Sequence, residues 1–177
     1  AIREDVHFTT IGNRPALGIC GSALIDAAAE LLRVGVISCD GTLLSASEVP
    51  VSVPERVRAR IGMGDRGPVF VIAEAHETQS GQRVALTQRD VRELQLATAA
   101  IRSGVRTLVT RMGLRLEDLQ RVLVAGAFGN YIRCHNAQRI GLLPWEVPED
   151  KFEFVGNASL AGACLAAVDL AHRRRAE

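Results

Sequence analysis

The sequence has few of the features that mark metal-binding, membrane and nucleic-acid-binding proteins. Its four cysteines are scattered and none belongs to a C-x-x-C pair, which excludes the usual spacing of an all-cysteine zinc or iron–sulfur site. No apolar run approaches the roughly 20 residues that a membrane-spanning helix needs. The formal net charge of +1 argues against a nucleic-acid-binding surface. We therefore expect a reduced, cytoplasmic protein with no metal site within this chain, no membrane and no nucleic acid partner.

The chain is long enough for one domain, and 47% of its 177 residues are hydrophobic, which is ample for a core. It begins at Ala1 without a methionine, which predicts a processed or excised piece of a longer protein. Apolar periodicity and turn residues predict five strands and four helices. The strands are expected over 6–11, 69–72, 83–86, 122–124 and 151–155, and the helices over 23–34, 87–113, 136–140 and from Asn157 onward.

Residues 62–67 match the dinucleotide fingerprint G-x-G-x-x-G letter for letter, but their context differs. That fingerprint must follow a strand and open a helix. Here Pro68 follows and leads into the strand predicted over 69–72. The pattern therefore predicts a mobile loop rather than a nucleotide site.

The long predicted helix is the clearest element of the sequence. Thr87 and Asp90 have the spacing of a capping box at its start. Apolar residues and one threonine recur every three or four positions, which predicts a buried face made of Val91, Leu94, Thr98, Ile101, Val105, Leu108 and Met112. The arginines, Arg102 among them, are expected on the opposite, solvated face. Gln95 and Thr98 are the polar residues nearest the buried face and are candidates to line a cleft.

A glycine turn follows the strand predicted over 122–124. Gly126 and Gly129 can adopt positive φ and let a ligand approach the backbone without a Cβ in the way. Asn130 can cap a short helix, whose backbone N–H groups would face the crevice beyond the strand. Two interpretations of this stretch remain open. It is either a ligand-binding turn that comprises Gly126, Ala127, Phe128, Gly129 and Asn130, or a glycine turn without a ligand.

The last predicted helix has a face nearly without side chains. After Gly156 and Asn157, small residues recur every four positions at Ala158, Gly162 and Ala166. Such a face lets two helices touch backbone to backbone, as at a hinge. An ordinary alanine-rich core helix explains the spacing equally well.

Cys20 lies just before the helix predicted over 23–34, where a helix N-terminus can lower the pKa of a thiol. This position makes it a candidate nucleophile. No histidine or acidic residue lies at a spacing that the sequence alone can pair with it. A small buried residue at a close-packed turn is the favoured interpretation, and the sequence predicts no catalytic residue in this chain.

Several segments resemble one known group of proteins. The pair V-L-V-A-G-A-F-G-N-Y-I at 122–132 and V-G-N-A-S-L-A-G-A at 155–163 resembles the end of the actin-like ATPase superfamily, which includes sugar kinases and heat-shock-type chaperones. The match sharpens with G-I-C-G-S-A-L-I-D at 18–26, L-T-Q-R-D-V-R-E-L-Q-L-A at 86–97 and I-G-L-L-P at 140–144. With these segments, the chain resembles the reductive activators of corrinoid proteins, which use ATP to help return a cob(II)alamin protein to cob(I)alamin.

The resemblance implies a fold and a site. The fold is an α/β, ribonuclease H-like (actin-like ATPase) lobe with a mixed sheet flanked by helices, truncated at its N-terminal side. Residues 1–177 would form the C-terminal lobe of that domain. In such a lobe the adenosine of ATP would lie against residues 126–130, with Gln95 nearby. The hinge to the other lobe would comprise Gly156, Asn157, Ala158 and Gly162.

The resemblance also implies cofactors and partners, some of them outside this chain. The longer protein would use ATP with Mg²⁺, take electrons from an iron–sulfur cluster in a domain absent from this chain, and bring a corrinoid protein from Co(II) to Co(I). A homodimer is compatible with this role. The alternatives are a lobe of a small-molecule kinase of the same superfamily, or a non-catalytic lobe that only docks or dimerises.

The chain departs from the family pattern at Ala23, where glycine is usual, and at Thr98, where lysine is usual. The second departure removes a charge that could reach the nucleotide from the long helix. The sequence also contains neither of the two acidic, glycine-rich hairpins that grip phosphate and Mg²⁺ in this superfamily, nor an iron–sulfur ligand set. We therefore expect this chain to be inactive on its own.

Overall fold

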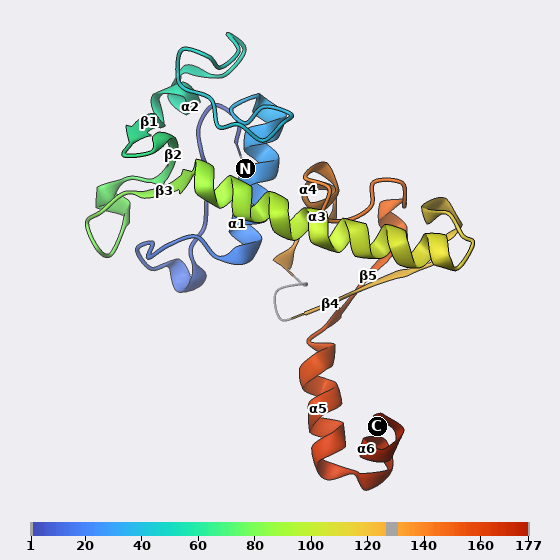
Figure 1. Cartoon of the computed structure of the whole chain (residues 1–177). Helices are drawn as coiled ribbons and strands as arrows, with labels where there is room; N and C mark the ends of the chain where they lie inside the picture. Colours follow the sequence, from blue (N-terminus) through green and yellow to red (C-terminus); the bar gives the residue numbers. More distant parts are fainter. Residues whose placement is uncertain (1, 127–130, 177) are drawn as a thin grey trace.

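The computed structural model describes residues 2–126 and 131–176, and Figure 1 shows their arrangement. Four residues of the predicted ligand turn, Ala127, Phe128, Gly129 and Asn130, lie outside the described residues. Within the described part, no helix is both long and apolar enough to cross a bilayer.

The chain alternates helices and strands, which confirms the α/β class. The first part contains α1 (Gly21–Val34), α2 (Glu55–Ala59), β1 (Ile61–Gly64), β2 (Gly67–Ala73), β3 (Val84–Thr87) and the long α3 (Gln88–Arg111). The second part contains β4 (Val122–Ala125), α4 (Cys134–Arg139), β5 (Phe152–Gly156), α5 (Ala158–Val168) and α6 (Leu170–Ala176). Among the described residues the strands form two sheets, an antiparallel β1-β2-β3 sheet and a parallel β4-β5 pair.

Two local predictions in the first part were wrong. The strand expected over 6–11 is absent, because Val6 forms only an isolated bridge with Ile2 and Ile11–Asn13 is a 3-10 turn. The glycine-rich segment 62–67 is not a loop, since it forms β1 and the turn into β2, with Gly62 opposite Val69. As Pro68 predicted, a strand and not a helix follows this segment. The antiparallel pairing of β2 with β3 confirms the expected hairpin.

The main core lies between α1, the antiparallel sheet and the start of α3. Phe70 and Leu86 from the sheet and Leu31 from α1 are fully buried. A smaller cluster joins the end of α3 to β4 and β5. Its members are Val109, Leu116 and Val147, with Val105, Leu119, Val122 and Phe152 packed against them. The start of α3 thus packs in the first cluster and its end in the second, and Figure 1 shows the helix running between the two parts of the chain.

Helix α3 begins at the predicted capping box. The Asp90 carboxylate accepts the Thr87 N–H at 2.8 Å, and the Thr87 hydroxyl oxygen accepts the Asp90 N–H at 3.3 Å. Its buried face differs from the prediction in the second half. Three residues predicted on this face are exposed, namely Ile101 at 49%, Leu108 at 65% and Met112 at 72%. Arg102 lies on the buried face instead. That face comprises Val91, Leu94, Thr98, Arg102, Val105 and Val109.

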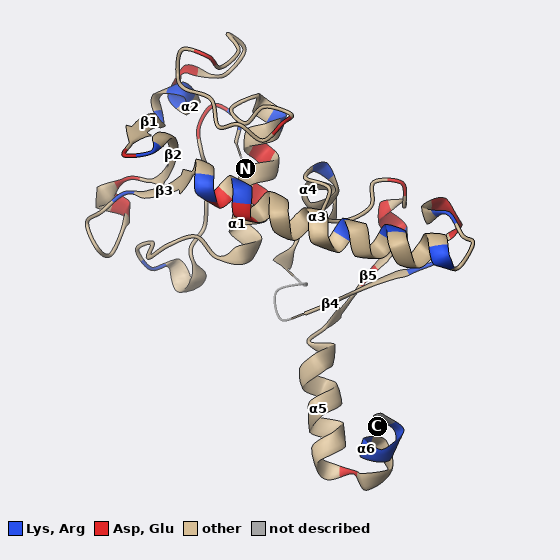
Figure 2. Ribbon diagram, viewed as in Figure 1, with Lys and Arg blue, Asp and Glu red and all other residues tan. Residues whose placement is uncertain are grey.

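The last two helices project from the rest of the chain (Figure 1). Helix α5 has no buried residue, and its main packing partner is α6. It is nonetheless apolar along its length, and Figure 2 shows no charged residue on it, whereas α6 carries a cluster of arginines. A helix that is apolar on all sides normally packs on all sides against other structure. Here its apolar residues are exposed, with Leu160 at 59% and Leu165 at 48%.

Candidate functional site

The parallel pairing of β4 and β5 brings the glycine turn that begins at Gly126 and the start of α5 to the same edge of the strand pair. The register sets Val122 opposite Phe152 and Ala125 opposite Gly156. Beyond the last pair, the Gly126 N–H donates to the Gly156 carbonyl at 2.8 Å. The glycine turn and the start of α5 therefore both leave from the carboxyl ends of neighbouring parallel strands, which is where α/β proteins bind ligands.

The backbone at this edge is open on the side where a side chain would stand. Gly126 has φ +140° and Gly156 has φ +70°, which confirms the positive φ predicted for Gly126. A Cβ added at either glycine would meet no described atom within 4 Å. A ligand could therefore approach both backbones without displacing a side chain of the described residues.

Helix α5 begins at the same edge. Asn157 is its N-cap residue, and the Asn157 side-chain oxygen accepts the Leu160 N–H at 3.1 Å. The positive end of the helix dipole thus lies beside the carboxyl ends of β4 and β5. The other predicted hinge residues, Ala158 and Gly162, lie in α5, and a Cβ on Gly162 would meet no described atom within 4 Å.

Gln95 binds a different part of the chain. Its Nε2 donates to the Asp40 carbonyl at 3.1 Å, and its Oε1 accepts from Arg92 at 2.8 Å. A Cβ on Gly41 would overlap only the end of the flexible Gln95 side chain, whereas the φ of +84° at Gly41 favours glycine whatever the space. No hydrogen bond joins Gln95 to the described part of the glycine turn. Its contact with a nucleotide remains a prediction.

Gln95 belongs to a row of polar side chains on α3 that hold the turn at 38–42. Gln88 donates to the Gly41 carbonyl at 2.9 Å and accepts the Leu43 N–H at 2.7 Å. Arg92 donates to the Asp40 carbonyl at 3.3 Å. The spacing of these three α3 residues places them on one side of the helix. Part of the L-T-Q-R-D-V-R-E-L-Q-L-A segment therefore serves to anchor a turn.

Thr98 lies further along α3, where it is 8% exposed. A methyl group on Gly141 would lie 3.7 Å from Thr98 and 3.6 Å from the Trp145 ring, so the I-G-L-L-P segment packs closely here. Next to it, the Arg102 guanidinium lies 3.3 Å from the centre of the Trp145 ring and 2.9 Å from a Glu146 carboxylate oxygen. We call this contact of Arg102, Trp145 and Glu146 the α3 joint. The prediction that Arg102 is solvated was wrong.

A second set of contacts, also missed by the sequence analysis, ties α4 to α1. The Asn136 amide donates to one oxygen of the Asp26 carboxylate at 2.6 Å. Arg133 Nε lies 3.4 Å from the other oxygen of the same carboxylate. Asn136 is fully buried. The only sequence signal was that Asp26 ends the G-I-C-G-S-A-L-I-D segment, and nothing in that segment indicated its partner 110 positions away.

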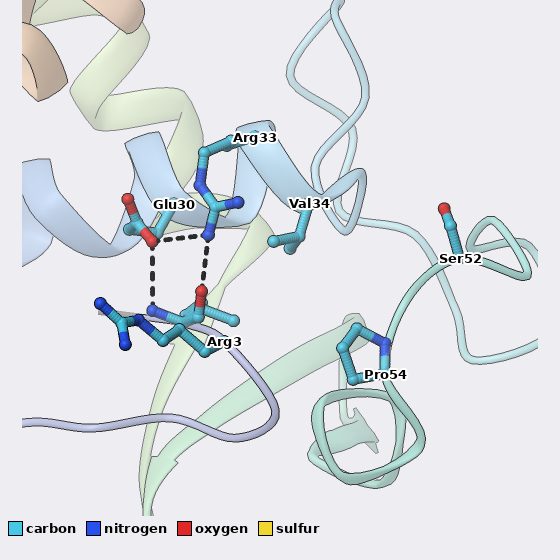
Figure 3. A pocket seen from close by; sticks show the side chains of 7 residues that line it. Arg3, Glu30, Arg33, Val34, Ser52 and Pro54 are labelled. Carbon is cyan, nitrogen blue, oxygen red and sulfur yellow. Dashed lines mark hydrogen bonds and ion pairs between the residues drawn. The ribbon is translucent and has the colours of Figure 1, made fainter.

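A cleft of about 580 Å³ lies away from these elements, between the N-terminal stretch, α1 and the loop before α2 (Figure 3). Arg33 donates to the Ile2 carbonyl at 2.6 Å and to Glu30 at 2.9 Å. Burial tends to raise the pKa of Glu30, but hydrogen bonds from Arg33 and the Ile2 N–H hold that pKa below its ordinary value. None of the predicted site residues lines this cleft. Across the described residues, no group of three or more metal-ligating side chains could hold a metal ion.

Cys20 is exposed, so its interpretation as a small buried residue was wrong; it is the N-cap residue of α1. The Ser22 hydroxyl, 3.5 Å from the thiol, and the Ala23 N–H lower the pKa of Cys20. We expect iodoacetamide to alkylate Cys20 with a pH midpoint below the ordinary thiol value of about 8.5. Mass spectrometry of the Cys20 peptide after alkylation at a series of pH values measures it. Ser22→Ala should raise the midpoint, and a midpoint of about 8.5 or above in the unchanged protein contradicts the expectation.

Comparison with known proteins assigns the chain to a family. A family model described as the C-terminal domain of RACo, the ASKHA domain, matches residues 2–177. The chain belongs to this family. ASKHA denotes the acetate and sugar kinase, heat-shock cognate and actin superfamily, so the actin-like fold expected from the sequence is confirmed.

The chain is also similar to individual proteins whose names refer to corrinoid activation or reduction. The corrinoid activation enzyme RamQ of Eubacterium limosum is 37% identical over 161 residues, 90% of this chain and 26% of that protein. A Co(II) methylated amine-specific corrinoid protein reductase of Methanosarcina barkeri is 36% identical over 81 residues, 46% of this chain and 15% of that protein. The solved structure of a reductive activator for a corrinoid, iron–sulfur protein superposes with a TM-score of 0.79 at 37% identity, covering 96% of this chain and 25% of the other. This RACo-family chain thus spans about a quarter of RamQ and of that activator.

Proposed function

We propose that this chain is the adenosine-side, C-terminal lobe of the actin-like domain of an ATP-dependent reductive activator. The longer protein would return a corrinoid protein from Co(II) to Co(I). The observation that carries the proposal is the shared edge of β4 and β5, where the Gly126 turn and the N-terminus of α5 lie side by side. Relatives named as corrinoid activators support the reaction class.

In this proposal the adenine and ribose of ATP lie against residues 126–130, and the start of α5 acts as the hinge to the other lobe. A nucleotide can drive closure only to the extent that it binds the closed arrangement more tightly than the open one. The turn and the hinge begin side by side, since the Gly126 nitrogen and the Gly156 carbonyl oxygen are 2.8 Å apart. A ligand that touches both can therefore bind the closed arrangement more tightly than the open one.

The described residues fit the adenosine end of ATP and not its phosphate end. They offer open glycine backbone at Gly126 and Gly156, but no acidic cluster for Mg²⁺ and no cysteine set for an iron–sulfur cluster. We propose that the longer protein holds the phosphates, Mg²⁺ and the electron source in segments outside this chain. When bound, ATP would supply the free energy for an unfavourable electron transfer to the corrinoid.

The exposed apolar residues of α5 support the role of a lobe. A parallel pair of only two strands and an apolar helix with no buried residue are both unusual as finished structures. We propose that further segments of the longer protein cover α5 and that its small-residue face at Ala158 and Gly162 packs closely there.

A substitution at Gly126 tests the nucleotide assignment. In the full-length protein we expect Gly126→Val to weaken ATP binding at least tenfold, which corresponds to about 1.4 kcal/mol. A side chain there meets no described atom within 4 Å, so it would occupy the space of the ligand. Calorimetric titration with ATP measures the affinity and thermal melting measures the stability. Gly129→Val should act in the same way.

Gly81→Val is the matched control. Gly81 has φ +68° and its added Cβ would also meet no described atom within 4 Å, but it lies in the exposed turn before β3. Both substitutions carry the strain of a side chain at positive φ, about 1–3 kcal/mol. Only Gly126→Val should change the affinity for ATP. An unchanged affinity with a lowered melting temperature in both variants would make the Gly126 turn purely structural.

A further inference from the structure

We propose that Asp26 is a positioning residue for the glycine turn at residues 126–130, which we call the nucleotide turn because the proposed function assigns the nucleotide to it. It holds Asn136 and Arg133, and so fixes the segment by which the chain leaves the turn. The expected effect on nucleotide binding rests on the proposed function, whereas the anchoring of α4 does not. Asp26 itself would touch no nucleotide atom.

The Asp26 carboxylate uses both of its oxygens on this segment. Oδ1 accepts from the Asn136 amide at 2.6 Å, and Oδ2 lies 3.4 Å from Arg133 Nε. Asn136 is fully buried, while the Asp26 side chain is 27% exposed. The shorter contact is therefore the more shielded from solvent, and it is a hydrogen bond to a charged acceptor, which is stronger than one between neutral groups.

A third contact extends the anchor along α4. Arg139 donates to the Asn136 side-chain oxygen at 3.3 Å and lies 3.9 Å from a Glu30 carboxylate oxygen. Arg133, Asn136 and Arg139 follow each other every three residues, and Asp26 and Glu30 are one turn apart on α1. One side of α4 therefore faces one side of α1 along its length. A helix of six residues has little stability of its own, so these contacts determine where α4 lies.

The described chain is thus anchored on both sides of residues 127–130. On one side, Gly126 is bonded to β5 through the Gly156 carbonyl at 2.8 Å. On the other side, the chain continues into α4, which is bonded to α1, and α1 is part of the main core through Leu31. Asp26 therefore helps to fix the place of residues 131–139, where the described chain continues after residues 127–130.

A polar anchor selects one placement of α4 where an apolar contact would allow several. If α4 shifted along α1, the buried Asn136 amide would lose its partner, and a buried polar group without a partner is unfavourable. An apolar residue of similar size would pack about as well after a small shift. Asp26 and Asn136 therefore fix the register between α1 and α4.

A reciprocal exchange in the full-length protein tests this. Asn136→Asp sets two carboxylates against each other, and we expect ATP affinity to fall at least tenfold in calorimetric titration. Adding Asp26→Asn restores the pair with donor and acceptor exchanged, and we expect the affinity to return to within about threefold of the original. Arg133 and Arg139 are present in both variants, and Asp26→Asn removes the negative partner of Arg133, so recovery in the double variant comes from the exchanged pair at positions 26 and 136 in spite of that loss.

Asp5→Asn is the matched control. Asp5 accepts from Arg60 at 2.6 Å, and its side chain is 28% exposed, a fraction close to the 27% of Asp26. Arg60 in turn donates to the Ile72 carbonyl of β2, so this ion pair serves β2 rather than α4. We expect this variant to lower the melting temperature without changing ATP affinity. An equal loss of affinity in Asp5→Asn would show that affinity follows general stability, and that would overturn the positioning role.

Amide hydrogen exchange of residues 131–139 gives a readout that does not depend on the nucleotide. We expect faster exchange in Asn136→Asp, exchange near the original rate in the double variant, and no change in Asp5→Asn. Unchanged exchange in Asn136→Asp, or no recovery in the double variant, overturns the proposal. If the unsubstituted protein binds no ATP, the proposed function fails, and the exchange data still decide whether Asp26 anchors α4.

Discussion

Arg102→Met is expected to lower the free energy of unfolding of this chain by about 3–5 kcal/mol. Arg102 and Glu146 are 2.9 Å apart, with side chains only 17% and 19% exposed. Removing the guanidinium leaves the Glu146 carboxylate charged and shielded from water without its partner. The stacking of Arg102 on Trp145, at 3.3 Å from the ring centre, is lost as well.

Urea denaturation measures this loss, because the only tryptophan of the chain, Trp145, lies in the α3 joint and its fluorescence reports on it. Arg89→Met on the same helix is the control. Arg89 and Glu93 are 3.9 Å apart and 76% and 66% exposed, so their loss should cost at most about 0.5 kcal/mol. Arg102→Lys should fall between the two, since lysine keeps the charge without the planar stacking. Equal effects of Arg102→Met and Arg89→Met would refute the contribution of the joint.

Leu160→Glu is expected to have opposite effects in this chain and in the full-length protein. In this chain Leu160 is 59% exposed and its N–H is bonded to the N-cap residue Asn157. A glutamate there completes a capping box and interacts favourably with the helix dipole, which stabilises the helix by about 0.3–1 kcal/mol. In the full-length protein, where we propose that α5 is covered, the same carboxylate would be buried without a partner, at a cost of several kcal/mol.

Circular dichroism of this chain and thermal melting of the full-length protein compare the two situations. Ser159→Glu is the control, because Ser159 carries the only hydroxyl of α5 and marks the side that already accepts a polar group. We expect it to be tolerated in both proteins. A full-length protein that melts at the same temperature with Leu160→Glu as without it would mean that α5 stays exposed, and the role of a lobe would fail.

The contacts of Arg102 and of Asp26 both lie outside the candidate site and support the elements that form it. The α3 joint connects α3 to the loop before β5, and β5 ends at Gly156, where the proposed hinge begins. Asp26 holds the other side of the turn through α4. The nucleotide turn would therefore be supported by one ion pair from α3 and another set of contacts from α1. Neither set of contacts is made by a residue of the 126–130 segment itself.

Local features of the fold could be predicted from the sequence because their causes lie within a few residues. The Thr87–Asp90 capping box and the positive φ of Gly126 are examples. The resemblance in short segments also identified the family and the actin-like fold, since those segments follow strand ends and helix starts that the fold reuses. The residues proposed to bind the nucleotide remain a prediction.

Only the tertiary structure decided which polar side chains are buried and what they bind. Periodicity placed Arg102 on the solvated face of α3, because a shift by one residue along a helix is invisible until the partner at Glu146 is known. The pairing of Asp26 with Asn136 joins positions 110 apart, and Gln95 binds a turn 55 positions earlier. Such contacts depend on how whole elements pack, and local sequence carries no information about a partner that is brought close only by the fold.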